Sequence, residues 1–139
     1  TAWCQLRFVV GTDPDDILPA LRRHLDRHGF NQVAIQPSRE VFMRATRLDP
    51  DSALMHWAAK SVTSTTGQPP NVLPNLGGSL PNDAFTDVLG MPTLWVPHSY
   101  ASCSQHAPNE HMLAPVAREG LRVMTGLFWD VGAGGVPTG

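Results

Sequence analysis

The chain has 139 residues, of which 42% are hydrophobic, so it can supply the core of one domain and is not a wholly disordered segment. Its net charge is −2, and its ten basic residues are scattered among twelve acids, which excludes the basic surface that nucleic acid or an anionic membrane requires. The partners that remain are small molecules and other proteins.

The two cysteines, Cys4 and Cys103, lie far apart and form no Cys-x-x-Cys motif. This usage favours a reduced, cytoplasmic protein. No apolar run reaches the roughly 18 residues of a membrane span, and we expect no signal peptide. Because the chain opens directly in a strand-like pattern without an initiator Met, we also expect a piece of a longer protein.

The first 37 residues predict a strand, a helix and a second strand. Residues 3–10 are rich in apolar and aromatic side chains and are followed by Gly11, as a strand would be. The helix is expected to start near Asp16, because Pro19 then falls within its first turn. Gly29 is expected to close this helix before a strand at residues 32–36. The apolar face of the helix is predicted to consist of Leu18, Leu21 and Leu25.

The rest of the chain continues this alternation of strands and helices. The predicted strands are a short one at 42–47, another at 72–73 and a buried one at 92–97; the predicted helices are 51–67, 81–89 and 113–129. Two helices have clear apolar faces, formed by Leu54, Trp57, Ala58 and Val62 in the first and by Val116, Gly120, Val123, Met124, Leu127 and Phe128 in the last. The predicted fold class is therefore α/β.

An irregular loop is predicted between the last strand and the last helix, and it contains four possible metal ligands. They are His98, Cys103, His106 and His111, separated by four, two and four residues. Imidazole and thiolate are the usual ligands of zinc, so together they could form a mononuclear site. Alternatively, the histidines are ordinary loop or capping residues and the cysteine is a small buried thiol.

Two motifs in order resemble the C-terminal part of the zinc-dependent aminoacylase and carboxypeptidase family. The first is Gly77-Gly78-Ser79-Leu80-Pro81, and the second is His106-Ala107-Pro108-Asn109-Glu110, with an apolar strand predicted between them. This family includes carnosinase-type dipeptidases, acetylornithine deacetylase, succinyl-diaminopimelate desuccinylase and glutamate carboxypeptidase. The Leu80-Pro81 pair is most similar to the dipeptidase branch.

The resemblance implies a role for several residues. His106 would be the last ligand of a two-metal centre, and Asn109 and Glu110 would support it, although either of these two could simply cap the last helix or fix the turn. The Gly77-Gly78-Ser79 loop would approach the substrate carboxylate, since glycine permits close approach of the backbone. Arg7 would clamp that carboxylate through its planar guanidinium, unless it is only a solvated strand residue.

The resemblance also implies a domain organisation. Residues 1–38 would be the second half of a ferredoxin-like lid, a dimerisation domain that makes the protein a homodimer. Residues 39–131 would be the C-terminal part of a mixed-sheet metallohydrolase catalytic domain, and residues 132–139 a flexible tail. The predicted fold is thus an α/β catalytic segment preceded by half of a lid.

The implied activity is hydrolysis of an amide bond in a small peptide or an N-acyl amino acid by a water that two metals activate. The metals would be zinc, with manganese or cobalt as alternatives. The family's His-x-Asp pair, bridging Asp and Glu-Glu base have no counterparts here, so we expect no catalytic residue in this segment, no activity from it alone, and a missing N-terminal part. The alternative is a non-catalytic dimerisation module or a mononuclear zinc-binding module. A hydrolase based on Ser79 or Cys103 is a weaker option, because no Gly-x-Ser-x-Gly motif or paired base is evident.

Overall fold

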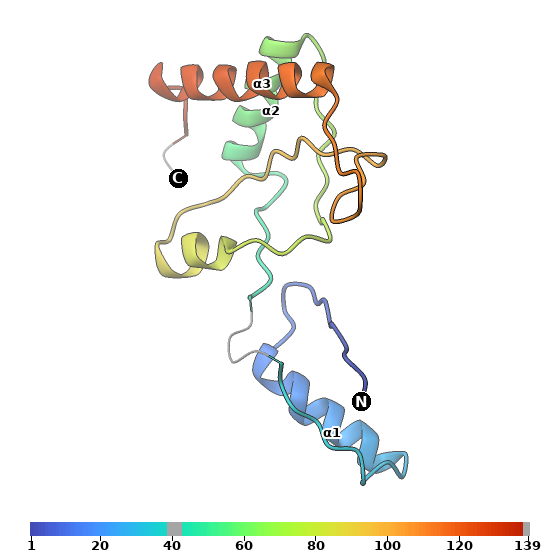
Figure 1. The fold of residues 1–139 in the computed structure, drawn as a ribbon. Helices are drawn as coiled ribbons and strands as arrows, with labels where there is room; N and C mark the ends of the chain where they lie inside the picture. The colour runs from blue at the N-terminus through green and yellow to red at the C-terminus, as the bar shows by residue number, and fades with distance from the viewer. Residues whose placement is uncertain (39–42, 138–139) are drawn as a thin grey trace. The chain divides into compact units, whose positions relative to one another are not determined.

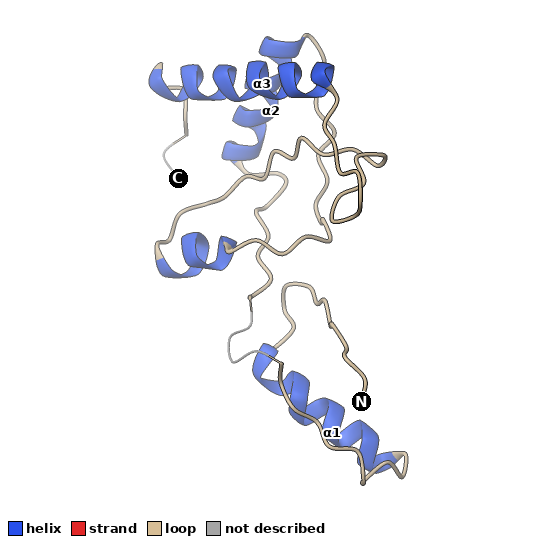
Figure 2. Cartoon of the chain, in the orientation of Figure 1, coloured by secondary structure: helices blue, strands red, loops and turns tan. Residues whose placement is uncertain are grey.

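The computed structural model describes residues 1–38 and 43–137, and its regular elements are all helical (Figure 1). Across these residues no strand is formed (Figure 2). In chain order the elements are the 3-10 turn η1 (Pro14–Asp16), helix α1 (Ile17–Arg27), helix α2 (Ala53–Thr66), the single π-helical turn η2 (Ala84–Val88) and helix α3 (Ala114–Gly132).

The expected α/β fold with a mixed sheet is therefore wrong for the described residues. Alternation of apolar and polar residues reports which side chains are buried, but a strand also needs a neighbouring strand for its backbone hydrogen bonds. No described segment supplies that neighbour, so the predicted strands are irregular segments at 3–10, 32–36, 43–47, 72–73 and 92–97. Residue 42, the start of one predicted strand, lies outside the described residues.

The chain divides into two units, the first formed by Thr1–Arg47 and Leu76–Thr93 and the second by Leu48–Asn75 and Leu94–Gly139. The boundaries of these units differ from those of the predicted domains 1–38, 39–131 and 132–139. The functions assigned to those domains stay predictions. Each unit is described separately below.

In unit 1, helix α1 starts where the sequence predicts it. The Asp13 carboxylate accepts a hydrogen bond from the backbone N–H of Asp15 at 3.0 Å, which caps η1 immediately before α1. The helix then starts at Ile17 and ends at Arg27, and Gly29 has a φ of 79° just after it. This confirms the expected start near Asp16 and the expected closure at Gly29.

One arginine of α1, Arg22, holds the segment that follows the helix by hydrogen bonds to its backbone. Arg22 pairs with Asp26 at 2.6 Å and donates to the backbone carbonyls of Phe30 at 3.1 Å and Val33 at 2.5 Å. These side-chain bonds replace the strand ladder that the sequence predicts for residues 32–36. On the helix itself Leu18 and Leu25 are half-buried, and no apolar side chain of the described part of unit 1 is fully buried.

In unit 2, helices α2 and α3 pack against each other and form the core. The buried residues Ala58, Val123 and Leu127 meet there. Half-buried side chains surround them: Trp57 and Val62 on α2, Met124 on α3, and Leu94 and Val96 from the segment before the loop. Leu94 and Val96 alternate with the exposed Trp95, so this segment keeps the period of a strand while it packs on helices.

The ends of both helices of unit 2 agree with the sequence. The Ser52 hydroxyl accepts a hydrogen bond from the Met55 backbone N–H at 3.3 Å and caps α2, and Gly67 ends that helix with a φ of 81°. Helix α3 begins at Ala114, one residue after the predicted start at 113, and continues past the predicted end at 129 to Gly132. One predicted core residue of α3 is wrong, because Phe128 is 72% exposed.

None of the described helices combines the length and the apolar character needed to cross a bilayer.

Candidate functional site

The loop before α3 in unit 2 is held by its own hydrogen bonds. The Tyr100 hydroxyl donates to the carbonyl of His111 at 3.2 Å and accepts from the N–H of Leu113 at 3.0 Å. The N–H of His111 donates in turn to the carbonyl of Cys103 at 3.1 Å, and Cys103 is buried. These bonds join the two ends of the loop across eight to thirteen residues, so the loop has a defined shape without a sheet beneath it.

The predicted metal ligand His106 lies at the outer turn of this loop, in a backbone conformation that is uncommon outside glycine. Ser104, His106 and Asn109 have φ values of 56°, 62° and 64°, in the left-handed region. The turn is stabilised by a bond from the Ala107 N–H to the Ser104 carbonyl at 2.9 Å. The imidazole of His106 is exposed, and no described residue hydrogen-bonds to its ring.

Glu110 holds the backbone of His106 and not its ring. One carboxylate oxygen of Glu110 accepts a hydrogen bond from the His106 N–H at 3.3 Å. The carbonyl of Asn109 contacts Nδ1 of His111 at 2.9 Å, which holds that second imidazole against the loop. The two supporting residues predicted from the sequence thus fix the turn, which was the simpler of their two expected roles.

The other possible ligands of the loop do not join His106. His98 packs against α3 at Gly120, where an added Cβ would lie 3.0 Å from its Nδ1 atom. His111 is engaged by Asn109, and its ring lies 6.1 Å from that of Tyr100, edge to face. In residues 1–38 and 43–137 no three His, Cys, Asp or Glu side chains are close enough together to hold a metal. The His111 ring is also exposed, but its contact with Asn109 uses Nδ1, so a metal at His106 would need further ligands from elsewhere.

Two of the predicted substrate-binding residues lie together in unit 1, although seventy residues separate them in the chain. The guanidinium of Arg7 donates from Nη1 to the carbonyl of Gly77. Gly78 forms a tight turn through a bond from its N–H to the Leu76 carbonyl at 2.9 Å. Arg7, Gly77, Gly78 and Ser79 are all exposed, so the remaining donors of the guanidinium face solvent next to the glycine-rich turn.

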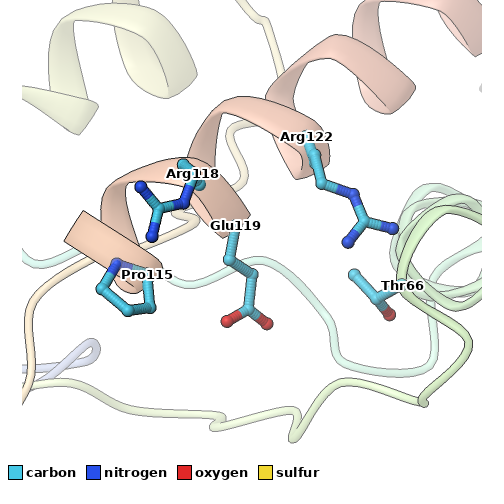
Figure 3. Close-up of a pocket in the computed structure, with 5 residues that line it drawn as sticks. All are labelled: Thr66, Pro115, Arg118, Glu119 and Arg122. Carbon is cyan, nitrogen blue, oxygen red and sulfur yellow. The ribbon is translucent and has the colours of Figure 1, made fainter. Parts of the chain in front are cut away.

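A groove of about 380 Å³ lies between the end of α2 and the start of α3 (Figure 3). Its lining residues are Thr66, Pro115, Arg118, Glu119 and Arg122, none of which the sequence singles out. Arg122 points toward α2 and donates to the Thr65 carbonyl at 3.0 Å, so it satisfies a carbonyl at the end of that helix. Glu119 and Arg122 extend to the same side of α3 in this view, and the ion pairs of the described residues do not include either side chain. This groove is explained by helix capping and is not the candidate site.

Comparison with known proteins returned no matching family model, no matching curated protein and no matching solved structure. The structure thus offers two separate candidate features, each within one unit. His106 and its loop belong to unit 2, and Arg7 with the Gly77-Gly78-Ser79 turn belongs to unit 1.

Proposed function

We propose that this chain is the C-terminal segment of a metal-dependent amidohydrolase or dipeptidase similar to the aminoacylase and carboxypeptidase family. The complete enzyme would hydrolyse an amide bond in a small peptide or N-acyl amino acid. The observation that carries the proposal is the exposed imidazole of His106, which a hydrogen-bonded loop presents without a partner for its ring among the described residues.

In this proposal His106 supplies one ligand to a pair of divalent metals. A neutral imidazole on a fixed turn suits zinc, and manganese or cobalt would also accept it. Glu110 holds the backbone of His106, which limits the directions in which the ring can point. When bound, the metals would polarise the amide carbonyl and activate the attacking water.

The segment is proposed to be inactive by itself, because a catalytic zinc needs about three protein ligands. The remaining ligands and the general base would come from an N-terminal part of the same protein. Exposed apolar side chains near the start of the chain, such as Trp3, Leu6 and Val9, support a covering partner there. That partner would be the missing part or a second copy in a homodimer formed through residues 1–38.

Arg7 is proposed to bind the terminal carboxylate of the substrate. Its contact with the Gly77 carbonyl uses one of the five guanidinium N–H donors, so a carboxylate can still be bound by the others. Because the Gly77-Gly78-Ser79 turn lies beside this guanidinium, its free backbone N–H groups and the Ser79 hydroxyl can add donors. We also propose a cytoplasmic location, since Cys4 and Cys103 are both free thiols.

The test begins with the intact mass of the natural gene product and its metal content. We expect a product of roughly three times this length that carries the pair of metals bound in part by His106, and a 139-residue segment that lacks this pair. In the natural product, His106→Ala should lower the metal content and reduce kcat for dipeptide hydrolysis by about 100-fold or more, because even residues that only orient a ligand contribute 10- to 100-fold.

His56→Ala is the matched control, because His56 is an exposed histidine of α2 outside the loop. It should leave the metal content and the rate unchanged. A natural product of only 139 residues, with one metal or none, would contradict the proposal. One metal per chain that is lost on His106→Ala would indicate a mononuclear zinc-binding module instead.

A further inference from the structure

Two histidines lie one helical turn apart at the end of α1, in unit 1 and outside the loop of His106. The centroids of the His24 and His28 rings are 4.4 Å apart, and their planes are tilted by 44°. The N–H of His28 still donates to the carbonyl of His24 at 3.2 Å, so the helical spacing continues through His28 although α1 ends at Arg27. Both side chains are exposed and can be reached from solvent.

This separation suits two imidazoles that share one metal ion. A ring nitrogen lies about 2.0–2.1 Å from a bound zinc, so each centroid lies about 3.2 Å from it. Two rings then have centroids about 5.2 Å apart at the tetrahedral angle of zinc, and about 4.5 Å apart at the right angle of a tetragonal nickel or copper site. The separation of 4.4 Å therefore requires only rotation of the two side chains. Histidines at positions i and i+4 also form the ligand pair of helical zinc sites in general.

The charges around His24 and His28 are compatible with binding of a cation. The last carbonyls of α1 contribute the negative end of the helix dipole, which stabilises positive charge at this end. Arg23 is paired with both carboxylate oxygens of Asp16 at 2.8 Å, so part of its charge is offset. Arg27 remains exposed and weakens cation binding.

We propose that His24 and His28 form a two-imidazole chelate for a divalent transition metal ion of the zinc, nickel and copper class. In the described part of the chain no third His, Cys, Asp or Glu joins them, so water completes the coordination. A bound ion would connect two successive turns and stabilise the end of α1. Affinity should follow the general order for imidazole ligands, with copper above nickel, and should fall at low pH because protons compete for the same nitrogens.

The test is a calorimetric titration of the full 139-residue chain with NiCl₂, together with NMR observation of the histidine ring protons. We expect His24→Ala and His28→Ala each to weaken binding at the site by at least about tenfold, since the second nitrogen binds at high effective concentration only when the first is held. The double variant should lose little more than either single variant. Far-UV circular dichroism should show the helix retained, because alanine favours helices.

His56→Ala serves as the single-histidine control and should leave the affinity unchanged. Small, additive losses from His24→Ala and His28→Ala would show two independent histidines and overturn the chelate. A loss on His106→Ala with none on His24→Ala would place the ion in the loop and also overturn it. Since the titration uses only this chain, its result is separate from that of the proposed amidohydrolase function.

Discussion

Gly126 of α3 faces Thr65 of α2 and leaves no space for a larger side chain. A Cβ at this position would lie 2.1 Å from the Thr65 Oγ1 atom, well inside van der Waals contact. We expect Gly126→Ala to lower the free energy of unfolding by about 1–3 kcal/mol, because the helices must shift to admit the methyl group. Urea denaturation followed by circular dichroism measures this change.

Gly132→Ala is the control for this prediction, since it changes the same helix where no atom lies within 4 Å of the new Cβ. It should be neutral or stabilise by up to about 1 kcal/mol through helix propensity. Adding Thr65→Ala to Gly126→Ala removes the clashing hydroxyl and should recover part of the loss. If both glycine variants have the same stability, the close contact between Thr65 and Gly126 does not exist in solution.

Individual site residues were predictable to different degrees. His106 could be chosen from the sequence because its motif combines an imidazole, a proline and an acid in one turn. The contact of Glu110 with the His106 backbone could not, since it depends on left-handed φ values that nothing in these residue types requires. The contact of Arg7 with Gly77 was not predicted: the resemblance implied only that both bind the substrate carboxylate, and spacing along the chain does not report a contact across seventy residues.

Among the elements, α2 shows why the helices were predictable. Its two ends are set by local signals, a Ser52 hydroxyl that caps the first turn and a left-handed Gly67 that ends the last. Strands depend on a partner strand: residues 92–97 have the apolar composition of a buried strand, but no other strand is present among the described residues, and Leu94 and Val96 pack against helices instead. Pairing over long distances is a tertiary property that local patterns do not encode.

A substitution at Ser52 tests whether its hydroxyl cap stabilises helix α2. Ser52→Ala removes the acceptor for the Met55 N–H, so we expect a loss of about 1 kcal/mol in the free energy of unfolding. Ser64→Ala, an exposed site within the same helix, is the matched control and should be neutral or slightly stabilising. Equal effects of the two substitutions in a denaturant titration would show that the cap does not hold α2.

The wrong prediction that Phe128 lies in the core is explained by the geometry of helix α3. Leu127 and Phe128 are neighbours in sequence and lie about 100° apart around α3. A broad sheet could cover both, but a single helix contacts only a narrow stripe, and Leu127 is buried while Phe128 is exposed. The predicted apolar face of α3 was therefore too wide at Phe128.

At the scale of the whole molecule, exposed apolar side chains are the main feature that the fold leaves unexplained. Only four apolar side chains in the described residues are buried: Ala58, Cys103, Val123 and Leu127. By contrast, Leu121, Phe128 and Trp129 form an exposed stripe on α3, with Phe128 and Trp129 respectively seven and eight positions after Leu121. A stripe of this kind promotes association when nothing covers it.

We expect the 139-residue chain to self-associate at micromolar concentration through this stripe when it is purified without a partner. The double variant Phe128→Gln and Trp129→Gln should shift the chain toward monomer in size-exclusion chromatography with light scattering. Its free energy of unfolding should change by no more than about 0.5 kcal/mol, because exposed side chains contribute little to the core. Leu127→Gln is the contrasting control: it places an amide in the core beside Val123 and should lower stability by several kcal/mol. If the double variant associates as strongly as the parent, the contact lies elsewhere, and residues 1–10 with their exposed Trp3 and Leu6 become the surface to change next.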